Sequence, residues 1–124
     1  LRAIKFVFES AGLKVVESSL EEHDRIMAYV QIAHHLSYLS LALTLWNGLG
    51  STDAQRFATR SLRRTFTMFG LFYENLRVIR EIAKLNRYGA EAIEHLKRML
   101  YRLADGDPKA WAEVEKALKA LSEL

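Results

Sequence analysis

The chain has 124 residues, half of them apolar, with one proline, six glycines and no cysteine. This length suffices for one domain with a real core, and the lack of cysteine excludes disulfides, thiolate metal sites and cysteine nucleophiles and favours a cytoplasmic setting. Eighteen basic and fifteen acidic residues give a net charge of +3, too small to identify a nucleic-acid binder. So few turn residues argue against a sandwich or barrel and predict a soluble, mostly helical domain.

The first residues combine a helix with an isolated strand. Residues 2–11 predict a short amphipathic helix that Gly12 ends in the left-handed conformation, and residues 13–17 predict one short strand. A strand without a later partner is expected when the last helix–strand unit of an α/β domain is separated from the rest of its sheet. A plain N-terminal helix with an extended linker explains the same residues equally well. The chain begins at Leu1 without a methionine, so we expect a fragment.

A long uncharged helix follows. Ser19 and Glu22 form a capping box, which predicts a helix from Leu20 to about Trp46. The 27 residues 26–52 contain no formal charge, which is enough apolar length for a membrane span. Polar residues are spread through this stretch and no basic flank follows it. We therefore expect a helix that protein buries on most of its faces.

The remaining residues predict further helices and hence an all-α domain. Thr52 and Gln55 resemble a second capping box, which opens a basic helix that Gly70 breaks or kinks. Asp107 caps a last helix with Pro108 at its first position, where the missing amide costs nothing. The helices are expected over residues 52–69, 71–87, 90–103 and from 108 onward.

Two lines of side chains stand out on the long helix. At 100° per residue a polar stripe falls within about 60° of arc, and a second line contains only small residues. Four polar groups in one line are difficult to satisfy inside a core, which favours a ligand cleft over a set of core hydrogen bonds. Small residues at this spacing allow another helix to approach closely. The polar stripe is Asp24, Gln31, His35 and Tyr38, and the small line is Ala33, Ser37, Ser40 and Thr44.

The next helix has a row of arginines at positions i, i+4, i+7 and i+8. A planar guanidinium matches a carboxylate or phosphate, and no acidic residue lies between Asp53 and Glu74 to pair with the row. An anionic ligand is therefore the functional interpretation, and a solvated basic face is the alternative. The row consists of Arg56, Arg60, Arg63 and Arg64.

No complete catalytic apparatus is recognisable. Gly48-Leu49-Gly50 is half of a dinucleotide fingerprint, but it follows a helix and lacks the third glycine. His34 and His35 point about 100° apart and have no carboxylate at metal-ligand spacing, so we expect no zinc or iron site. We therefore expect no catalytic, nucleotide-binding or metal-binding residue in this chain.

The segment Glu22–His35 resembles the one that joins the two domains of prephenate dehydrogenases. Its pattern is His-Asp, then a Val or Ile, a Gln or Ser, and a His four residues further on. Residues 11–16 resemble the last helix, glycine and strand of the family's Rossmann domain, and residues 62–75 resemble its next helical stretch. The matching positions of the first segment are His23, Asp24, Val30, Gln31 and His35.

The resemblance implies a fold, a reaction and a set of contacts. Residues 1–18 would be the tail of a nucleotide-binding Rossmann domain, and residues 19–124 a helical substrate-binding and dimerisation domain, like the C-terminal domain of 6-phosphogluconate dehydrogenases. The family oxidises and decarboxylates prephenate to 4-hydroxyphenylpyruvate with NAD or NADP, which the missing Rossmann part binds, in tyrosine biosynthesis. A homodimer is implied, without a nucleic-acid or membrane partner, and this chain alone should be inactive. The implied substrate-binding residues are His35, Gln31 and Arg63, with Arg60 and Arg64 as register alternatives.

One departure keeps other functions open. Some family members have a carboxylate-binding arginine after the glycine matched by Gly70, where this chain has Leu71. An arogenate dehydrogenase-type relative, or a non-catalytic helical dimerisation or regulatory module, is therefore an alternative. A basic nucleic-acid binder would use residues 56–102, which have a local charge of +7, but lysine is scarce there.

Overall fold

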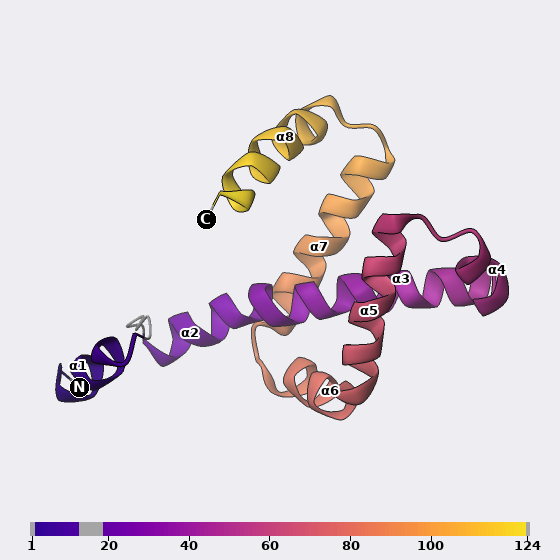
Figure 1. Ribbon diagram of the computed structural model, residues 1–124. Coiled ribbons are helices and arrows are strands. Elements are labelled where there is room, and N and C mark those ends of the chain that lie inside the picture. Colours follow the sequence, from indigo (N-terminus) through magenta and orange to yellow (C-terminus); the bar gives the residue numbers. More distant parts are fainter. Residues whose placement is uncertain (1, 13–18, 124) are drawn as a thin grey trace.

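The computed structural model describes residues 2–12 and 19–123, and every regular element within them is a helix (Figure 1). This confirms the predicted all-α fold. The strand expected over residues 13–17 lies outside the described residues. In chain order the elements are α1 (Arg2–Ser10), α2 (Leu20–Met27), η1 (Ala28–Ala33), α3 (His34–Gly48), α4 (Ser51–Arg56), α5 (Arg60–Glu74), α6 (Leu76–Leu85), α7 (Gly89–Ala104) and α8 (Pro108–Ser122).

The helix ends that were predicted from capping chemistry are confirmed at Gly12, Ser19 and Asp107. The Ser19 hydroxyl accepts a hydrogen bond from the Glu22 amide at 3.0 Å and starts α2. Gly12 and Gly106 end α1 and α7 with φ of 82° and 74°, a conformation that favours glycine. The Asp107 carboxylate accepts from the Lys109 amide at 3.0 Å, with Pro108 at the first position of α8.

Two other predicted boundaries are wrong. Instead of one helix from Thr52 to Phe69, α4 ends at Arg56 and α5 begins at Arg60, where the Thr59 hydroxyl accepts from the Leu62 amide at 3.2 Å. Thr59 is thus the capping residue, and Thr52 lies inside α4. Gly70 neither breaks nor kinks α5 into two helices, because that helix continues to Glu74.

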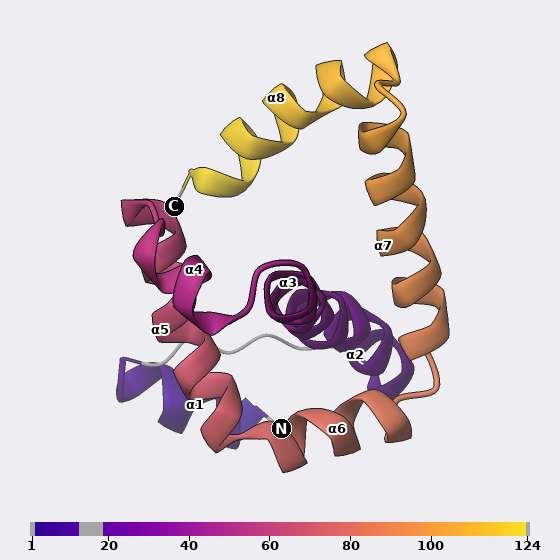
Figure 2. The same ribbon diagram turned by 90° about the vertical axis from the view of Figure 1, so that its right-hand side faces the viewer.

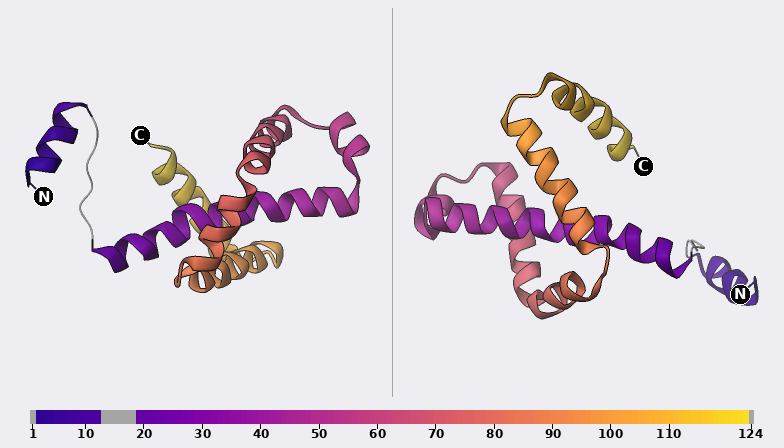
Figure 3. Two further views of the ribbon diagram at one scale, coloured as in Figure 1. Left: turned by 90° about the horizontal axis from the view of Figure 1, so that it is seen from below. Right: turned by 180° about the vertical axis from the view of Figure 1, so that it is seen from behind.

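Helices α2, η1 and α3 form one continuous rod from Leu20 to Gly48, close to the predicted extent. Its middle is η1, a π-helical turn that the sequence did not indicate. Helix α7 crosses the rod at η1, as two views of Figure 3 show. The core forms at this crossing, where Ala28, Ile32 and Ala92 are fully buried against one another.

Small residues permit the close crossing of α7 over the rod. A Cβ added to the buried Gly89 would lie 3.2 Å from Cδ1 of Ile32 and 3.4 Å from the Ala83 carbonyl oxygen. Polar contacts frame the crossing: the Asn86 amide donates to the Asp24 carbonyl at 2.8 Å, and the Tyr29 hydroxyl lies 3.2 Å from Nδ1 of His95. The rod and α7 are therefore fixed at one point by both packing and hydrogen bonds.

We expect Ala92→Leu to destabilise the fold by about 1–3 kcal/mol, because a fully buried alanine leaves no room for three more carbon atoms. Thermal unfolding followed by circular dichroism measures this loss. Ala90→Leu is the matched control, since Ala90 lies on the exposed side of the same helix. Equal melting temperatures for the two variants would contradict the crossing as described.

The single chain does not bury α3, the second half of the long helix that protein is expected to cover on most of its faces. No residue of α3 is buried by the described parts of the chain, and Leu43 and Trp46 are 62% and 65% exposed. Figure 2, which looks along the rod, shows α5, α6 and α7 around it and α8 further out on the remaining side. By length and composition alone the rod could also cross a membrane. One such helix near the N-terminus is weak evidence of a membrane span.

Candidate functional site

An aromatic cluster holds two of the polar-stripe residues in the middle of the domain. His35 and Tyr38 of α3 both contact the ring of Phe72 in α5 edge-on, each with 5.3 Å between ring centroids. His34 packs against the same ring at 6.0 Å. Phe72 is buried, whereas His35 and Tyr38 remain half-exposed. The packing of α5 on α3 therefore fixes these side chains and leaves part of each open to a ligand.

His35 is electrostatically the most unusual residue of the cluster. Its Nδ1 atom is buried and has no hydrogen-bond partner among the described residues. Burial of the ring, together with the nearby His34, lowers the pKa of His35 below its ordinary value. The imidazole is therefore neutral at pH 7 and offers one donor and one acceptor nitrogen. A neutral imidazole suits a hydroxyl or carbonyl of a ligand better than a positively charged imidazole does.

The lowered pKa makes fold stability depend on pH. Because the folded state disfavours protonated His35, its contribution is present above the ordinary histidine pKa of about 6.5 and is lost as the pH falls below it. Melting temperatures measured between pH 7.5 and pH 5 should fall on acidification. The fall should be shallower in His35→Gln, and an identical pH dependence in both proteins would contradict this origin.

The four residues of the predicted polar stripe do not share one face. The η1 turn winds more widely than an α-helix, so the side chains before and after it lose their α-helical phase. Asp24 lies beside α6, where its carbonyl accepts from Asn86 and its carboxylate is 3.6 Å from His23. Gln31 is half-buried within η1 itself. The structure thus brings His35 and Tyr38 together and separates Asp24 from them.

Arg60, Arg63 and Arg64 lie toward the start of α5 and are exposed, whereas Arg56, the first arginine of the predicted row, ends α4. Arg60, Arg63 and Arg64 precede Phe72 by twelve, nine and eight residues, so Arg63 lies about 13 Å further along the helix axis. Nine residues of α-helix also place Arg63 on the opposite face from Phe72, whereas Arg64 is rotated from it by about 80°. Within one chain, Arg63 and His35 therefore do not face the same space.

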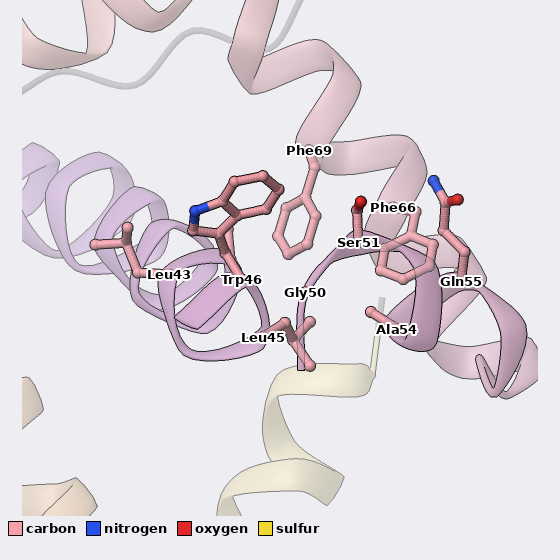
Figure 4. Close-up of a pocket in the computed structure, with 10 residues that line it drawn as sticks. Leu43, Leu45, Trp46, Gly50, Ser51, Ala54, Gln55, Phe66 and Phe69 are labelled. Carbon is pink, nitrogen blue, oxygen red and sulfur yellow. The ribbon is translucent and has the colours of Figure 1, made fainter. Parts of the chain in front are cut away.

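A cavity of about 480 Å³ opens at the far end of α3, between α3, α4 and α5. In Figure 4, Trp46 of α3 and Phe69 of α5 extend toward one another beside the turn at Gly50. None of the predicted site residues lines it. The sequence offers the spacing of Phe66 and Phe69 as a signal, but the same aromatic residues are equally typical of a core. The lining residues are Ala42, Leu43, Leu45, Trp46, Gly50, Ser51, Ala54, Gln55, Phe66 and Phe69.

Comparison with known proteins identifies the family. Residues 19–105 match the family model described as prephenate dehydrogenase, dimerization domain. Searches of curated proteins and of solved structures gave no match. The matched segment starts at the Ser19 cap, includes the α7 crossing and the aromatic cluster, and ends at the turn before α8. The chain belongs to the prephenate dehydrogenase dimerization-domain family.

Proposed function

We propose that this chain pairs with a second copy of itself and thereby supplies the dimer core of a prephenate dehydrogenase. The observation that supports this proposal is the small-residue face of α3. Ser37, Ser40 and Thr44 are exposed and lie on the side of α3 opposite His35 and Tyr38, which face α5. That face is free to receive a helix from outside the chain.

The hydroxyl groups on this face do not need an external partner. Ser37 donates to the Ala33 carbonyl at 2.7 Å, Ser40 to the Ser37 carbonyl at 3.1 Å and Thr44 to the Ser40 carbonyl at 2.7 Å. Because each hydroxyl already donates a hydrogen bond within the helix, another helix can cover this face without leaving a buried donor unsatisfied. Leu41 and Leu43 flank it and are exposed. We name Ala33, Ser37, Ser40 and Thr44 the α3 seam.

A sedimentation experiment tests the pairing. We expect the 14.3 kDa chain to sediment at micromolar concentration with twice its own mass, because the exposed apolar side chains of α3 exceed what a stable monomer leaves in water. Dilution should shift the population to the single chain. A species of single-chain mass throughout the micromolar range would contradict the proposal.

The proposed reaction is the oxidative decarboxylation of prephenate to 4-hydroxyphenylpyruvate with NAD or NADP. The described residues do not fit the nucleotide, because Gly50 precedes a six-residue helix and follows another helix, not a strand. We therefore propose that a cytoplasmic enzyme of this kind binds the nucleotide through a Rossmann domain preceding residue 19. This chain would then contribute substrate contacts and no catalytic residue.

For those contacts we propose His35, Gln31 and the arginines of α5. Prephenate has two carboxylates, and a neutral His35 can hydrogen-bond its ring hydroxyl or side chain while a guanidinium pairs with a carboxylate. Arg63 is the first candidate by its place in the segment that resembles the family. Since it faces away from Phe72 of its own chain, Arg63 would serve a substrate held by a neighbouring copy, and Arg64 would serve its own.

A relative that acts on arogenate is the second candidate. Leu71 stands where some family members have a carboxylate-binding arginine, and α5 continues unbroken through this position. Side-by-side turnover of prephenate and arogenate by the complete enzyme distinguishes the two. Preference for arogenate would leave the dimerisation proposal intact and change only the substrate.

A further inference from the structure

The ring of Tyr38 is packed on more than one side, while its hydroxyl has no partner. The ring centroid lies 5.3 Å from that of His34, 5.3 Å from that of Phe72 and 6.4 Å from that of Phe69, each in edge-on geometry. The hydroxyl makes no hydrogen bond to any described residue and is open to solvent. Packing therefore fixes the direction of this side chain and leaves its O–H group available to a ligand.

The two other half-buried tyrosines use their hydroxyls within the chain. The Tyr29 hydroxyl lies 3.2 Å from Nδ1 of His95, and the Tyr88 hydroxyl accepts from the Arg87 guanidinium at 3.1 Å. A tyrosine hydroxyl that packing draws into a domain usually has such a partner. Tyr38 departs from this pattern, which leaves its O–H group for a partner outside the chain.

His35 presents a second free group on the same side of α3. Its Nδ1 is buried and unpartnered, whereas its Nε2 makes no hydrogen bond to the part of the chain that the structure describes and is open to solvent. A proton on Nδ1 would be a buried donor without an acceptor, and orphaned buried N–H groups are rarer in proteins than unpaired acceptors. The neutral imidazole therefore has its proton on Nε2. His35 consequently offers a ligand an N–H donor and no acceptor.

Phe72 holds the two donors next to one another. His35 and Tyr38 are three residues apart, so their side chains leave α3 within about 60° of one another. Both rings meet the ring of Phe72 edge-on, with 5.3 Å between centroids in each case. The buried Phe72 side chain has no hydrogen-bonding atom, so it orients both rings and occupies neither donor. The N–H and the O–H are thus adjacent donors for neighbouring atoms of one ligand.

The two helices of the cluster provide no carboxylate beside these donors. Residues 34–48 contain no acidic residue, and residues 54–73 contain four arginines and no acidic residue. Glu74 ends α5, but it is exposed and leaves the helix about 200° from Phe72. An ammonium group placed beside His35 would therefore meet an N–H donor and no anion from either helix.

We propose that Tyr38 is a further substrate-binding residue, and that its O–H and the Nε2–H of His35 together bind a 2-oxo acid group. This rests on the proposed function, in which prephenate is the substrate and an arginine pairs with its other carboxylate. The keto oxygen and the neighbouring carboxylate oxygen of the pyruvyl side chain are adjacent acceptors, which two adjacent donors match. Arogenate has an ammonium group in place of the keto oxygen, so the same pair binds arogenate less well.

The ring hydroxyl of prephenate is a poorer match for this pair. In the proposed oxidation that hydroxyl must lose its proton, and a group that accepts a proton has to lie beside it. His35 cannot accept, because its bare nitrogen is the buried Nδ1. The side chain of the substrate is therefore the part that the pair contacts.

Tyr38→Phe in the complete enzyme tests the contact, because it removes one oxygen atom and keeps the ring on Phe72. We expect KM for prephenate to rise about tenfold, as for one lost hydrogen bond, with kcat and the affinity for NAD nearly unchanged. The melting temperature should stay the same, since this hydroxyl has no partner in the described chain. Tyr29→Phe is the matched control: it removes a hydroxyl that meets His95, so it should lower the melting temperature and leave KM unchanged.

Arogenate tests the 2-oxo acid assignment. The parent enzyme should prefer prephenate. In Tyr38→Phe the affinity for arogenate, measured as a substrate or as a competitive inhibitor of prephenate turnover, should fall by less than about threefold, because the keto oxygen that the hydroxyl binds is missing from it. The preference for prephenate should therefore shrink in this variant. Equal losses for the two compounds, or a parent enzyme that prefers arogenate, would overturn the assignment.

The remaining outcomes separate this inference from the proposed function. Turnover of prephenate with an unchanged KM in Tyr38→Phe would overturn Tyr38 as a substrate-binding residue and leave the proposed function standing. A complete enzyme that turns over neither prephenate nor arogenate would overturn both.

Discussion

Ser40→Glu should separate the two copies of this chain. The α3 seam is exposed in the single chain and made of small residues, so a glutamate there costs the monomer little. In the dimer the same carboxylate would be buried without a cation opposite it, and symmetry would bury it twice. We expect the dimer dissociation constant to rise on the order of 10³-fold, which analytical ultracentrifugation over a concentration series measures.

Ser40→Ala is the matched control for this experiment. It removes the hydroxyl that is already bonded to the Ser37 carbonyl, and it preserves the small size that a neighbouring helix needs. Its dissociation constant should stay close to that of the parent chain. A dimer of unchanged affinity in Ser40→Glu would mean that the seam faces solvent and that the copies meet elsewhere.

Arg63→Ala should weaken the use of prephenate by the complete enzyme. Removing one partner of a shielded, charge-assisted pair leaves a substrate carboxylate unpaired at a cost of a few kcal/mol, so KM should rise on the order of 10²-fold. The affinity for NAD should change little, because the proposed nucleotide site lies in a Rossmann domain that precedes residue 19. Initial-rate kinetics with each substrate varied in turn measure the separation.

The arginine series also reports where the substrate lies. Arg77→Ala is the control, since Arg77 is exposed on α6 and pairs with Glu81 at 3.7 Å, away from the α5 row. If KM for prephenate rises in Arg64→Ala and not in Arg63→Ala, one copy provides the whole pocket. If Arg60, Arg63 and Arg64 all tolerate alanine without a kinetic change, the row is a solvated face, and the non-catalytic module is the better account.

Local chemistry explains which helix boundaries could be predicted. Ser19, Gly12 and Asp107 act through hydrogen bonds and dihedral angles within a few residues, and such signals are complete in the sequence. Thr52 shows the limit of the same reasoning, because its spacing to Gln55 imitates a capping box that the backbone does not use. The choice of Thr59 depends on how α4 and α5 pack around the cavity, which no local pattern contains.

The sequence proposed residues for the site but not their geometry. His35 was proposed as a substrate contact through a resemblance over residues 22–35, and this role stays a prediction. The structure places His35 beside Tyr38 on the ring of Phe72, in a half-open aromatic cluster. The polar stripe was projected on an uninterrupted α-helix, and η1 invalidates that projection for Asp24. The apolar pattern of α3 predicted that this helix needs a cover, but such a pattern does not show which chain supplies it.

The π-helical turn has a further consequence for the rod. One extra residue in the winding rotates all of α3 by about 100° relative to the continuation of α2. The faces that α2 and η1 present to α6 and α7 are therefore set independently of the face that α3 presents outward. The η1 turn thus offsets the helical phase of one end of the rod from that of the other. The number of residues in η1 decides which side of the rod each neighbouring helix contacts.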